Sequence, residues 1–362
     1  MTIPGRTLLL GTRKGLVVYK HTPSGWRFDR DYFLGIPVSL AAVDTRHDTW
    51  WAMLDHGHWG CKLHRSANAG ETWEALDAPK YPPGEIVKEN VPATLKYLWA
   101  FAAGGPAQNG RLYLGTEPGG LFTSDDNGHT WDLNRGLWDR PERQERWFGG
   151  GRDQPGIHSI VVDPKDPDHL YVGISCAGVY ESRDGGATWT PRNRGLRAEY
   201  LPEPMAEVGH DPHRVIACPG DPLKMWQQNH CGIYHSVDGG ANWTEVSEMD
   251  GPAKFGFAIA VDSNDGNVAW VVPALKDEYR VPVNHALCVC RTEDGGKRWQ
   301  QFSKGLPQSA CYDLVYRHAL AVHGDTLAFG TTTGNLYLSE DRGEGWRCLN
   351  THLPPVYSVA FA

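Results

Sequence analysis

The sequence predicts an all-β protein that folds as one seven-bladed β-propeller domain spanning residues 1–362. Three observations lead to this fold class. An octapeptide ending in tryptophan recurs along the chain, each copy lies in a unit of four short apolar segments, and helical periodicity is almost absent. Repeats with a period near fifty residues are typical of propellers and other repeat arrays.

The octapeptide has the form Ser-x-Asp-x-Gly-x-Thr-Trp in SRDGGATW at 182–189, and a degenerate first copy, HTPSGW, ends at Trp26. Its hydroxyl, its carboxylate and glycines that accept positive φ predict a turn that satisfies its own hydrogen bonds. The tryptophan would then pack between neighbouring sheets. We therefore expect a structural turn without a catalytic role. The seven tryptophans lie at positions 26, 73, 131, 189, 243, 299 and 346.

Each unit contains four predicted strands, and the fourth unit shows them most clearly. Its innermost strand is HSIVVDP at 158–164, and the turn at 182–189 joins its third and fourth strands. The first unit lacks an inner strand, whereas VYSVAFA at 356–362 is left over at the carboxyl end. Pairing this tail with the first unit would close the ring and remove two open sheet edges. Further inner strands are predicted at 97–103, 214–219, 257–263 and 312–318.

These octapeptides resemble Asp-boxes, the repeats of the BNR, sialidase and sortilin-like propeller superfamily, over essentially the whole chain. The chain is also similar to bacterial cytoplasmic proteins described as glycosyl hydrolase or sialidase-like, in which QPGIHSI, EVGHDPH and QQNHCG recur. Xyloglucanase-type relatives place catalysis between two propellers, and photosystem II assembly factors dock protein on one. The Arg-Ile-Pro signature of sialidases is missing, because GIPVS at 35–39 lacks the arginine. No sialidase site residue is therefore carried over.

Composition excludes several classes of partner. The formal net charge of −8 is not the basic footprint of a nucleic-acid binder, and no apolar run is long enough to span a membrane. The amino-terminal stretch has only a three-residue apolar run before Gly11, which is shorter than a secretory h-region. The eight cysteines form no paired framework. Together these features predict a reduced, cytoplasmic protein, and they leave its oligomeric state open.

Loop lengths predict which face of the ring carries the function. In an antiparallel blade the octapeptide turns share one face with the first-to-second turns, and the second-to-third loops share the other face with the connections between blades. The long segments all fall on this second face, and long loops in a compact domain are usually functional. We therefore expect a pocket over the central axis there. The long segments are 54–60, 77–96, 134–158, 193–213 and 273–287.

Histidines gather near this predicted pocket. Aligning the units places His158 and His213 at the start of adjacent inner strands, His210 just before His213, and His230 in a second-to-third loop of the same blade as His213. Glu207 and Asp211 are close in sequence. Imidazole with carboxylate suits Zn, Mn, Fe or Ni, so these four histidines are the candidate ligands of a divalent metal. The alternative is that each histidine only caps a loop.

Arginines and aromatic residues supply candidate substrate contacts, because guanidinium groups hold carboxylates and aromatic faces stack on sugar rings. Glu117 and Glu207 are the candidate groups for proton transfer, although Glu117 could instead pair with an arginine. The glycines at 149–151 would allow the preceding loop to act as a lid. The candidate substrate-binding residues are Arg13, Arg146, Trp147, Arg152, Tyr279 and Arg280.

These residues favour a metal-dependent hydrolase or lyase that acts on a small anionic or sugar-like substrate, a carbohydrate or carboxylate. Two alternatives remain open at this point. One is a propeller that docks a protein partner, which predicts a large exposed apolar patch on the rim. The other is a metal-free glycosidase that uses two carboxylates.

Overall fold

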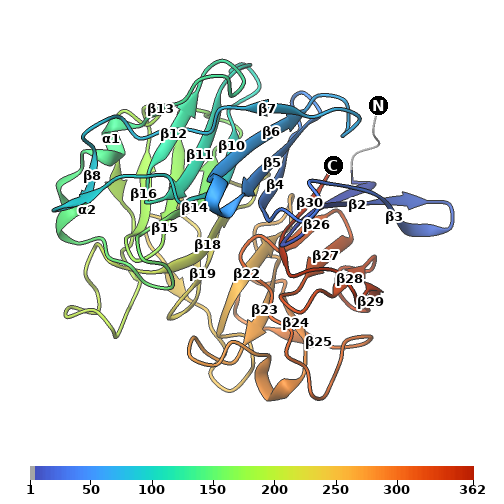
Figure 1. Cartoon of the computed structure of the whole chain (residues 1–362). Coiled ribbons are helices and arrows are strands. Elements are labelled where there is room, and N and C mark those ends of the chain that lie inside the picture. The colour runs from blue at the N-terminus through green and yellow to red at the C-terminus, as the bar shows by residue number, and fades with distance from the viewer. Residues whose placement is uncertain (1–4) are drawn as a thin grey trace.

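The computed structural model describes residues 5–362 and contains a ring of seven four-stranded antiparallel sheets (Figure 1). The predicted fold class is thereby confirmed. Residues 1–4, the start of the amino-terminal stretch, lie outside the described residues. The described helices are short and lie in loops: α1 (Arg135–Trp138), α2 (Pro141–Glu145) and the 3-10 turns η1 (Gly57–Trp59) and η2 (Val283–His285). No helix among these residues is both long and apolar enough for a membrane span.

The blades follow one another along the chain, and within each blade the chain order places one strand innermost and the others progressively outward. From the axis outward, blade 1 is β30 (Val356–Phe361), β1 (Thr7–Thr12), β2 (Gly15–Thr22) and β3 (Gly25–Tyr32). Blade 2 is β4 (Val38–Asp44), β5 (Thr49–Asp55), β6 (Cys61–Ser66) and β7 (Glu74–Leu76). Blade 3 is β10 (Tyr97–Ala103), β11 (Leu112–Glu117), β12 (Leu121–Ser124) and β13 (Asp132–Leu133). A two-stranded hairpin, β8 (Ile86–Lys88) and β9 (Val91–Pro92), lies between blades 2 and 3 in sequence.

The remaining four blades have the same internal order. Blade 4 is β14 (Ile157–Val162), β15 (Leu170–Ile174), β16 (Gly178–Ser182) and β17 (Thr190–Pro191). Blade 5 is β18 (Pro212–Ala217), β19 (Met225–Asn229), β20 (Gly232–Ser236) and β21 (Thr244–Glu245). Blade 6 is β22 (Phe255–Val261), β23 (Ala269–Ala274), β24 (Val289–Thr292) and β25 (Gln300–Phe302). Blade 7 is β26 (Leu320–His323), β27 (Thr326–Gly330), β28 (Leu336–Ser339) and β29 (Arg347–Asn350).

The carboxyl-terminal strand closes the ring, as predicted. β30 pairs antiparallel with β1, with Leu10 opposite Val359. Val356 is fully buried and packs in the same apolar cluster as Leu8 and Leu10. Closure in this way supplies the innermost strand of blade 1 and covers the edge of β1 that would otherwise be open.

The octapeptide turns have the predicted hydrogen bonds. In blade 4, Gly186 N donates to Ser182 Oγ (2.8 Å) and Thr188 N donates to Asp184 Oδ1 (2.8 Å). The indole Nε1 of Trp189 donates to the carbonyl oxygen of Gly186 (3.0 Å), so the ring is fixed against its own turn. These turns lie on the face opposite the long loops and satisfy their own polar groups, which agrees with a structural role.

Blade 7 departs from the prediction, because residues 312–318 form no strand and the innermost strand is β26. Asp313 explains this difference. Its buried carboxylate accepts hydrogen bonds from Asn335 Nδ2 (2.9 Å) and Tyr337 Oη (3.4 Å). A buried carboxylate needs such partners, and they hold this segment in an irregular path across the end of the blade.

Candidate functional site

A cavity of about 1110 Å³ opens over the central axis on the face of the long loops. This is the face on which the sequence predicts a pocket. Second-to-third loops and connections between blades supply its wall, for example through Asp55, Cys176 and His230. The opposite face carries the octapeptide turns.

The floor of the cavity is built by irregularities in the innermost strands. The register shifts by one residue or more in β4, β10, β14, β18, β22 and β30. A β-bulge redirects the side chain at its position. The residues at or within these shifts that line the cavity are Ser39, Trp99, His213, Phe257 and Tyr357.

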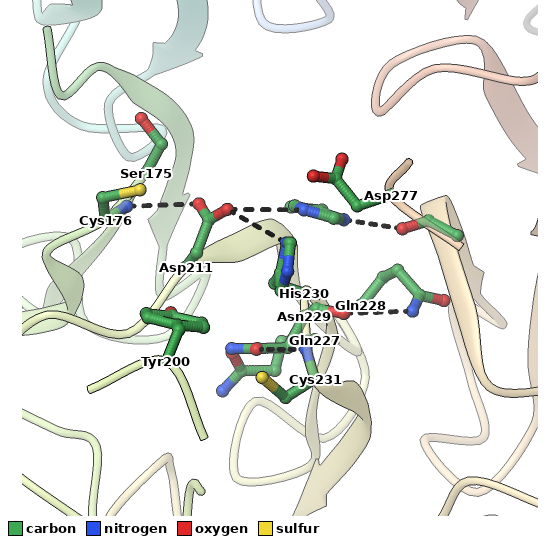
Figure 2. A network of polar contacts seen from close by, with 12 residues as sticks. Ser175, Cys176, Tyr200, Asp211, Gln227, Gln228, Asn229, His230, Cys231 and Asp277 are labelled. Carbon is green, nitrogen blue, oxygen red and sulfur yellow. Dashed lines mark hydrogen bonds and ion pairs between the residues drawn. The ribbon is translucent and has the colours of Figure 1, made fainter. Parts of the chain in front are cut away.

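Asp211, His213 and His230 form one compact group in the wall of this cavity. Each offers a ligand atom, and these atoms all lie within 4.8 Å of one another. Oδ2 of Asp211 lies 3.5 Å from Nε2 of His213 and 3.7 Å from Nδ1 of His230. Its other oxygen, Oδ1, accepts a hydrogen bond from Cys176 N (3.1 Å), which fixes the carboxylate (Figure 2). Two imidazoles and a carboxylate are a ligand set for a divalent metal.

The protonation state of His213 also favours metal binding. Its Nδ1 donates to the carbonyl oxygen of Gly256 (2.6 Å), and burial lowers the pKa of the imidazole although Asp211 opposes this shift. A neutral ring with its proton on Nδ1 directs the lone pair of Nε2 toward the Asp211 carboxylate. A metal ion between these two atoms, or a proton on Nε2, would satisfy both of them. A backbone carbonyl that holds the second nitrogen is also the usual orientation device for a metal-ligating histidine.

Asp211 is ionised. Burial alone would raise the pKa of its carboxyl, but His213 and His230 in their protonated forms, together with the charge of Arg317, hold this pKa well below its usual range. The carboxylate is therefore ready to bind a cation at neutral pH.

Four guanidinium groups line the same cavity, and they differ in whether they are paired. Arg152 forms an ion pair with Glu117 (2.7 Å), and Arg280 pairs with Asp277 (2.5 Å). In Arg317, by contrast, the Nε atom is buried without a hydrogen-bond partner among residues 5–362. The fourth is Arg13, which is exposed at the mouth.

Arg317 is held between two aromatic rings. Its guanidinium carbon lies 5.0 Å from the ring centre of Trp99 and 5.4 Å from that of Phe257. Burial lowers its pKa, and the rings stabilise the charge through cation–π contact. The result is a positive group at the cavity floor that can receive an anionic ligand.

The structure brings together two of the four predicted metal ligands. His210 is directed elsewhere, with its Nε2 2.7 Å from the carbonyl oxygen of Ala206. His210 precedes β18 and forms an isolated bridge with Ala177 of blade 4, outside the strand that carries His213. His158 is fully buried, with Nδ1 2.9 Å from Ser159 Oγ and its ring against Trp99. Neither His158 nor His210 belongs to the group.

The predicted substrate-binding residues divide into two sets. Arg13, Arg152 and Arg280 line the cavity. Trp147 is instead a core residue, whose Nε1 donates to Tyr180 Oη (2.8 Å). The two that remain, Arg146 and Tyr279, are exposed and lie outside the cavity lining.

The two glutamates predicted to transfer protons do not line the cavity. Glu117 is buried beside Arg152, as its alternative interpretation expects, and burial raises its pKa although Arg152 opposes this. Glu207 is exposed and its Oε1 accepts a hydrogen bond from Asn193 N (3.1 Å). The carboxylates that do line the cavity are Asp55, Asp211 and Asp277.

The sequence prediction missed several residues of the floor, above all Arg317, Trp99 and Phe257. Trp99 and Phe257 lie in predicted inner strands, where their alternation predicts only a place in the sheet. The bulges that redirect them leave no local signature in the sequence. Arg317 lies in the segment wrongly predicted as the inner strand of blade 7.

No family model matches the chain. Curated relatives are found at low identity. An oligoxyloglucan-reducing end-specific xyloglucanase of Emericella nidulans is 22% identical over 288 residues, which cover 78% of this chain and 30% of that protein. Xyloglucanase Xgh74A of Acetivibrio thermocellus is 27% identical over 295 residues, covering 73% and 33%. The photosystem II assembly lipoprotein Ycf48 of a Synechococcus species is 25% identical over 142 residues, 39% of this chain. The chain spans about a third of the length of these relatives.

Solved structures share the fold. An ancestral GH74 enzyme superposes with a TM-score of 0.58 at 18% identity, covering 90% of this chain and 38% of that one. YCF48 from Cyanidioschyzon merolae superposes with a TM-score of 0.55 at 14% identity, covering 93% and 94%. At such identities the structures establish a propeller fold alone. The sequence relatives are glycoside hydrolases on one side and an assembly factor on the other.

Proposed function

We propose that this protein is a metal-dependent hydrolase or lyase that acts on a small, carboxylate-bearing, sugar-like substrate in the axial cavity. The observation that carries this proposal is the group of Asp211, His213 and His230, whose ligand atoms lie within 4.8 Å of one another in the cavity wall. The ionised Asp211 and the neutral His213 are in the states that metal binding requires.

Zn, Mn, Fe and Ni are the metals that this ligand set suits. Three protein ligands leave a coordination position for a water molecule or a substrate oxygen, and a bound ion would activate that water or polarise a carbonyl group. Cys176 N and the carbonyl oxygen of Gly256 act in the outer shell, because they orient Asp211 and His213.

The substrate class follows from the other groups of the cavity. The half-buried guanidinium of Arg317 lines the cavity and suits a substrate carboxylate. Tyr316 and Tyr357 line the same cavity and offer aromatic surface on which a sugar ring can pack. The xyloglucanases among the sequence relatives support a carbohydrate as the body of the substrate.

Metal content of the purified, tag-free protein tests this proposal. After expression in metal-replete medium, inductively coupled plasma mass spectrometry is expected to find close to one divalent metal ion per chain. His230→Ala should lose it, and this variant is expected to fold because His230 is only half-buried. The matched control is His352→Ala, which removes an exposed histidine outside the cavity. Absence of metal from the wild type, or its retention in His230→Ala, would overturn the proposal.

Docking of a protein partner is the second candidate function. Large apolar side chains are exposed on the face of the long loops, including Leu34 (73% exposed), Trp59 (69%) and Met205 (68%). Exposed apolar groups on one face are typical of interaction sites, and Ycf48 is among the relatives. This function predicts that the wild type captures a partner protein in stoichiometric amount. The Trp59→Ser variant should no longer capture this partner, whereas the His230→Ala variant should capture it as the wild type does.

We also infer that the octapeptides are Asp-boxes and that the protein works in a reducing compartment. The repeated hydrogen-bond pattern of the turns supports the first inference. All eight cysteines are unpaired, which supports the second. Thiol titration of protein purified under anaerobic conditions should count eight free thiols, and fewer would contradict it.

A further inference from the structure

A second cavity, of about 750 Å³, lies on the axis at the opposite face of the ring. Innermost strands and first-to-second turns form its wall, including Thr45 and Ser263. His318 is the one residue that lines both cavities. The proposed metal ligands Asp211, His213 and His230 do not line this second cavity, so its chemistry is separate from the proposed function.

Arg214 of β18 supplies the positive charge that stands out in this cavity. Its Nη1 contacts Nδ1 of His318, whereas its Nε is buried without a partner among residues 5–362. Within this described part of the chain, the cavity lining contains no aspartate or glutamate. Burial lowers the pKa of Arg214 to about 10, and no carboxylate offsets this effect. The guanidinium thus enters the interior without a counter-charge.

Three polar side chains that line the cavity together with Arg214 are uncharged. Burial holds the pKa values of His158 and His318 well below the usual range, so both rings are neutral. Nε2 of His158 is buried and unpartnered in the described structure. The hydroxyl of Ser358 accepts a hydrogen bond from Ala41 N (2.9 Å) and keeps its own proton to donate.

We propose that this second cavity binds a small oxyanion, a phosphate or a carboxylate, at the guanidinium of Arg214. The planar guanidinium matches two oxygens of a carboxylate or phosphate. A half-buried guanidinium without a counter-ion is costly, and an oxyanion reduces this cost. The cavity is large enough to admit the ion together with ordered water.

Isothermal titration of the full-length protein with inorganic phosphate, and separately with acetate, tests this site. Saturable binding of at least one anion is expected at constant chloride concentration, and the comparison distinguishes the two kinds of oxyanion. Arg214→Gln should weaken the binding by about tenfold or more, since a hydrogen bond to a charged group is lost. No saturable binding of either anion by the wild type would overturn the proposal.

Arg298→Gln is the matched control, because it removes an exposed guanidinium that lines neither cavity. Phosphate and acetate affinity should be unchanged in this variant. Binding that is lost in Arg317→Gln and kept in Arg214→Gln would place the anion in the first cavity and refute the inference. Metal content should be unaffected by Arg214→Gln, so a failure of the anion site is separate from a failure of the proposed function.

Crystals of the wild type soaked in selenate keep the test independent of how the variants fold. Selenium scatters anomalously, so its position is found without ambiguity. A peak within hydrogen-bond distance of the Arg214 guanidinium is expected. A selenate that binds elsewhere but not at Arg214, or no bound selenate at all, would count decisively against the site.

Discussion

Nε2 of His213 faces Oδ2 of Asp211 at 3.5 Å, while the other ring nitrogen of His213 is held by the carbonyl oxygen of Gly256 at 2.6 Å. The imidazole therefore has one committed nitrogen and one that is directed into the cavity. This orientation leaves Nε2 of His213 free to bind a metal ion together with Asp211. A substitution of Asp211 tests the proposed metal site.

Asp211→Asn should abolish stoichiometric metal binding. The substitution keeps the shape of the side chain but removes its charge. Loss of a residue that orients a metal ligand typically lowers the metal affinity by about 10–100-fold, and loss of the ligand itself should lower it further. Equilibrium dialysis against Zn²⁺ or Mn²⁺ measures the affinity. Asp277→Asn, which changes another carboxylate of the same cavity outside the metal group, should bind as the wild type does. Equal affinities for the two variants would contradict the assignment.

Arg317→Met should make the protein more stable. Methionine keeps the apolar contacts with Trp99 and Phe257, and it removes a guanidinium whose buried Nε has no partner in the described structure. Relief of about 1 kcal/mol would raise Tm by about 2 °C. Thermal denaturation followed by circular dichroism measures this change. Arg280→Met, which removes a half-exposed and paired guanidinium, should not raise Tm, and a lower Tm for Arg317→Met would show that the charge is already compensated.

Ser182→Ala should destabilise the fold without changing the metal content. The buried hydroxyl of Ser182 accepts a hydrogen bond from Gly186 N (2.8 Å) and donates one to Asp184 Oδ1 (2.8 Å). Its removal leaves the backbone N–H of Gly186 unpaired, at a cost of about 1–3 kcal/mol. Urea denaturation gives the free energy of unfolding. Ser309→Ala, at an exposed position, serves as control, and an equal effect of both substitutions would argue against a structural role for the turn.

Lowering the pH should reduce the free energy of unfolding, and His235 should account for part of this reduction. Burial, with Lys224 adding to it, lowers the pKa of this histidine to about 4, and its ring stacks on Trp226 at 4.2 Å. The unfolded chain takes up this proton near pH 6.5, so its contribution to stability is full above that pH and is lost as the pH falls toward 4. His235→Phe keeps an aromatic ring there but cannot be protonated.

The measurement compares the free energies of unfolding of the wild type and His235→Phe at pH 7 and pH 4.5. The wild type should lose more stability than the variant over this interval. Other buried histidines titrate in both proteins, so only the difference between the two curves reports on His235. Curves that stay parallel would show that His235 is protonated as easily in the fold as in the unfolded chain.

Most of the fold could be predicted from the sequence, because its signals are local. The turn at Ser182–Trp189 satisfies its hydrogen bonds within eight residues, and the tail at 356–361 was the one segment left to pair with blade 1. The inner strand of blade 7 was predicted wrongly because the sequence pattern is local, whereas the residues that hold this segment are distant in the sequence. Residues 312–318 look like a strand, but Asp313 is held by Asn335 and Tyr337 of the following strands.

The candidate site was predicted only in part. Loop lengths identified its face, and sequence alignment of the repeats brought His213 and His230 together. The exclusion of His210 depended on its bridge to Ala177 and its contact with the carbonyl oxygen of Ala206, and that of His158 on a bulge in β14. Glu207 and Arg146 are exposed and lie outside the cavity lining, which no local pattern reveals.

Local chemistry was sufficient to specify the repeat, the turn, the number of blades and the face that carries the long loops, because each depends on residues close together in the chain. Which side chains meet on the axis was decided by the closed ring. Bulges in the innermost strands turn Trp99, His213 and Phe257 toward one cavity. Arg317 and Asp211, more than a hundred residues apart, face the same space only because blade 7 and blade 5 are held around a common axis.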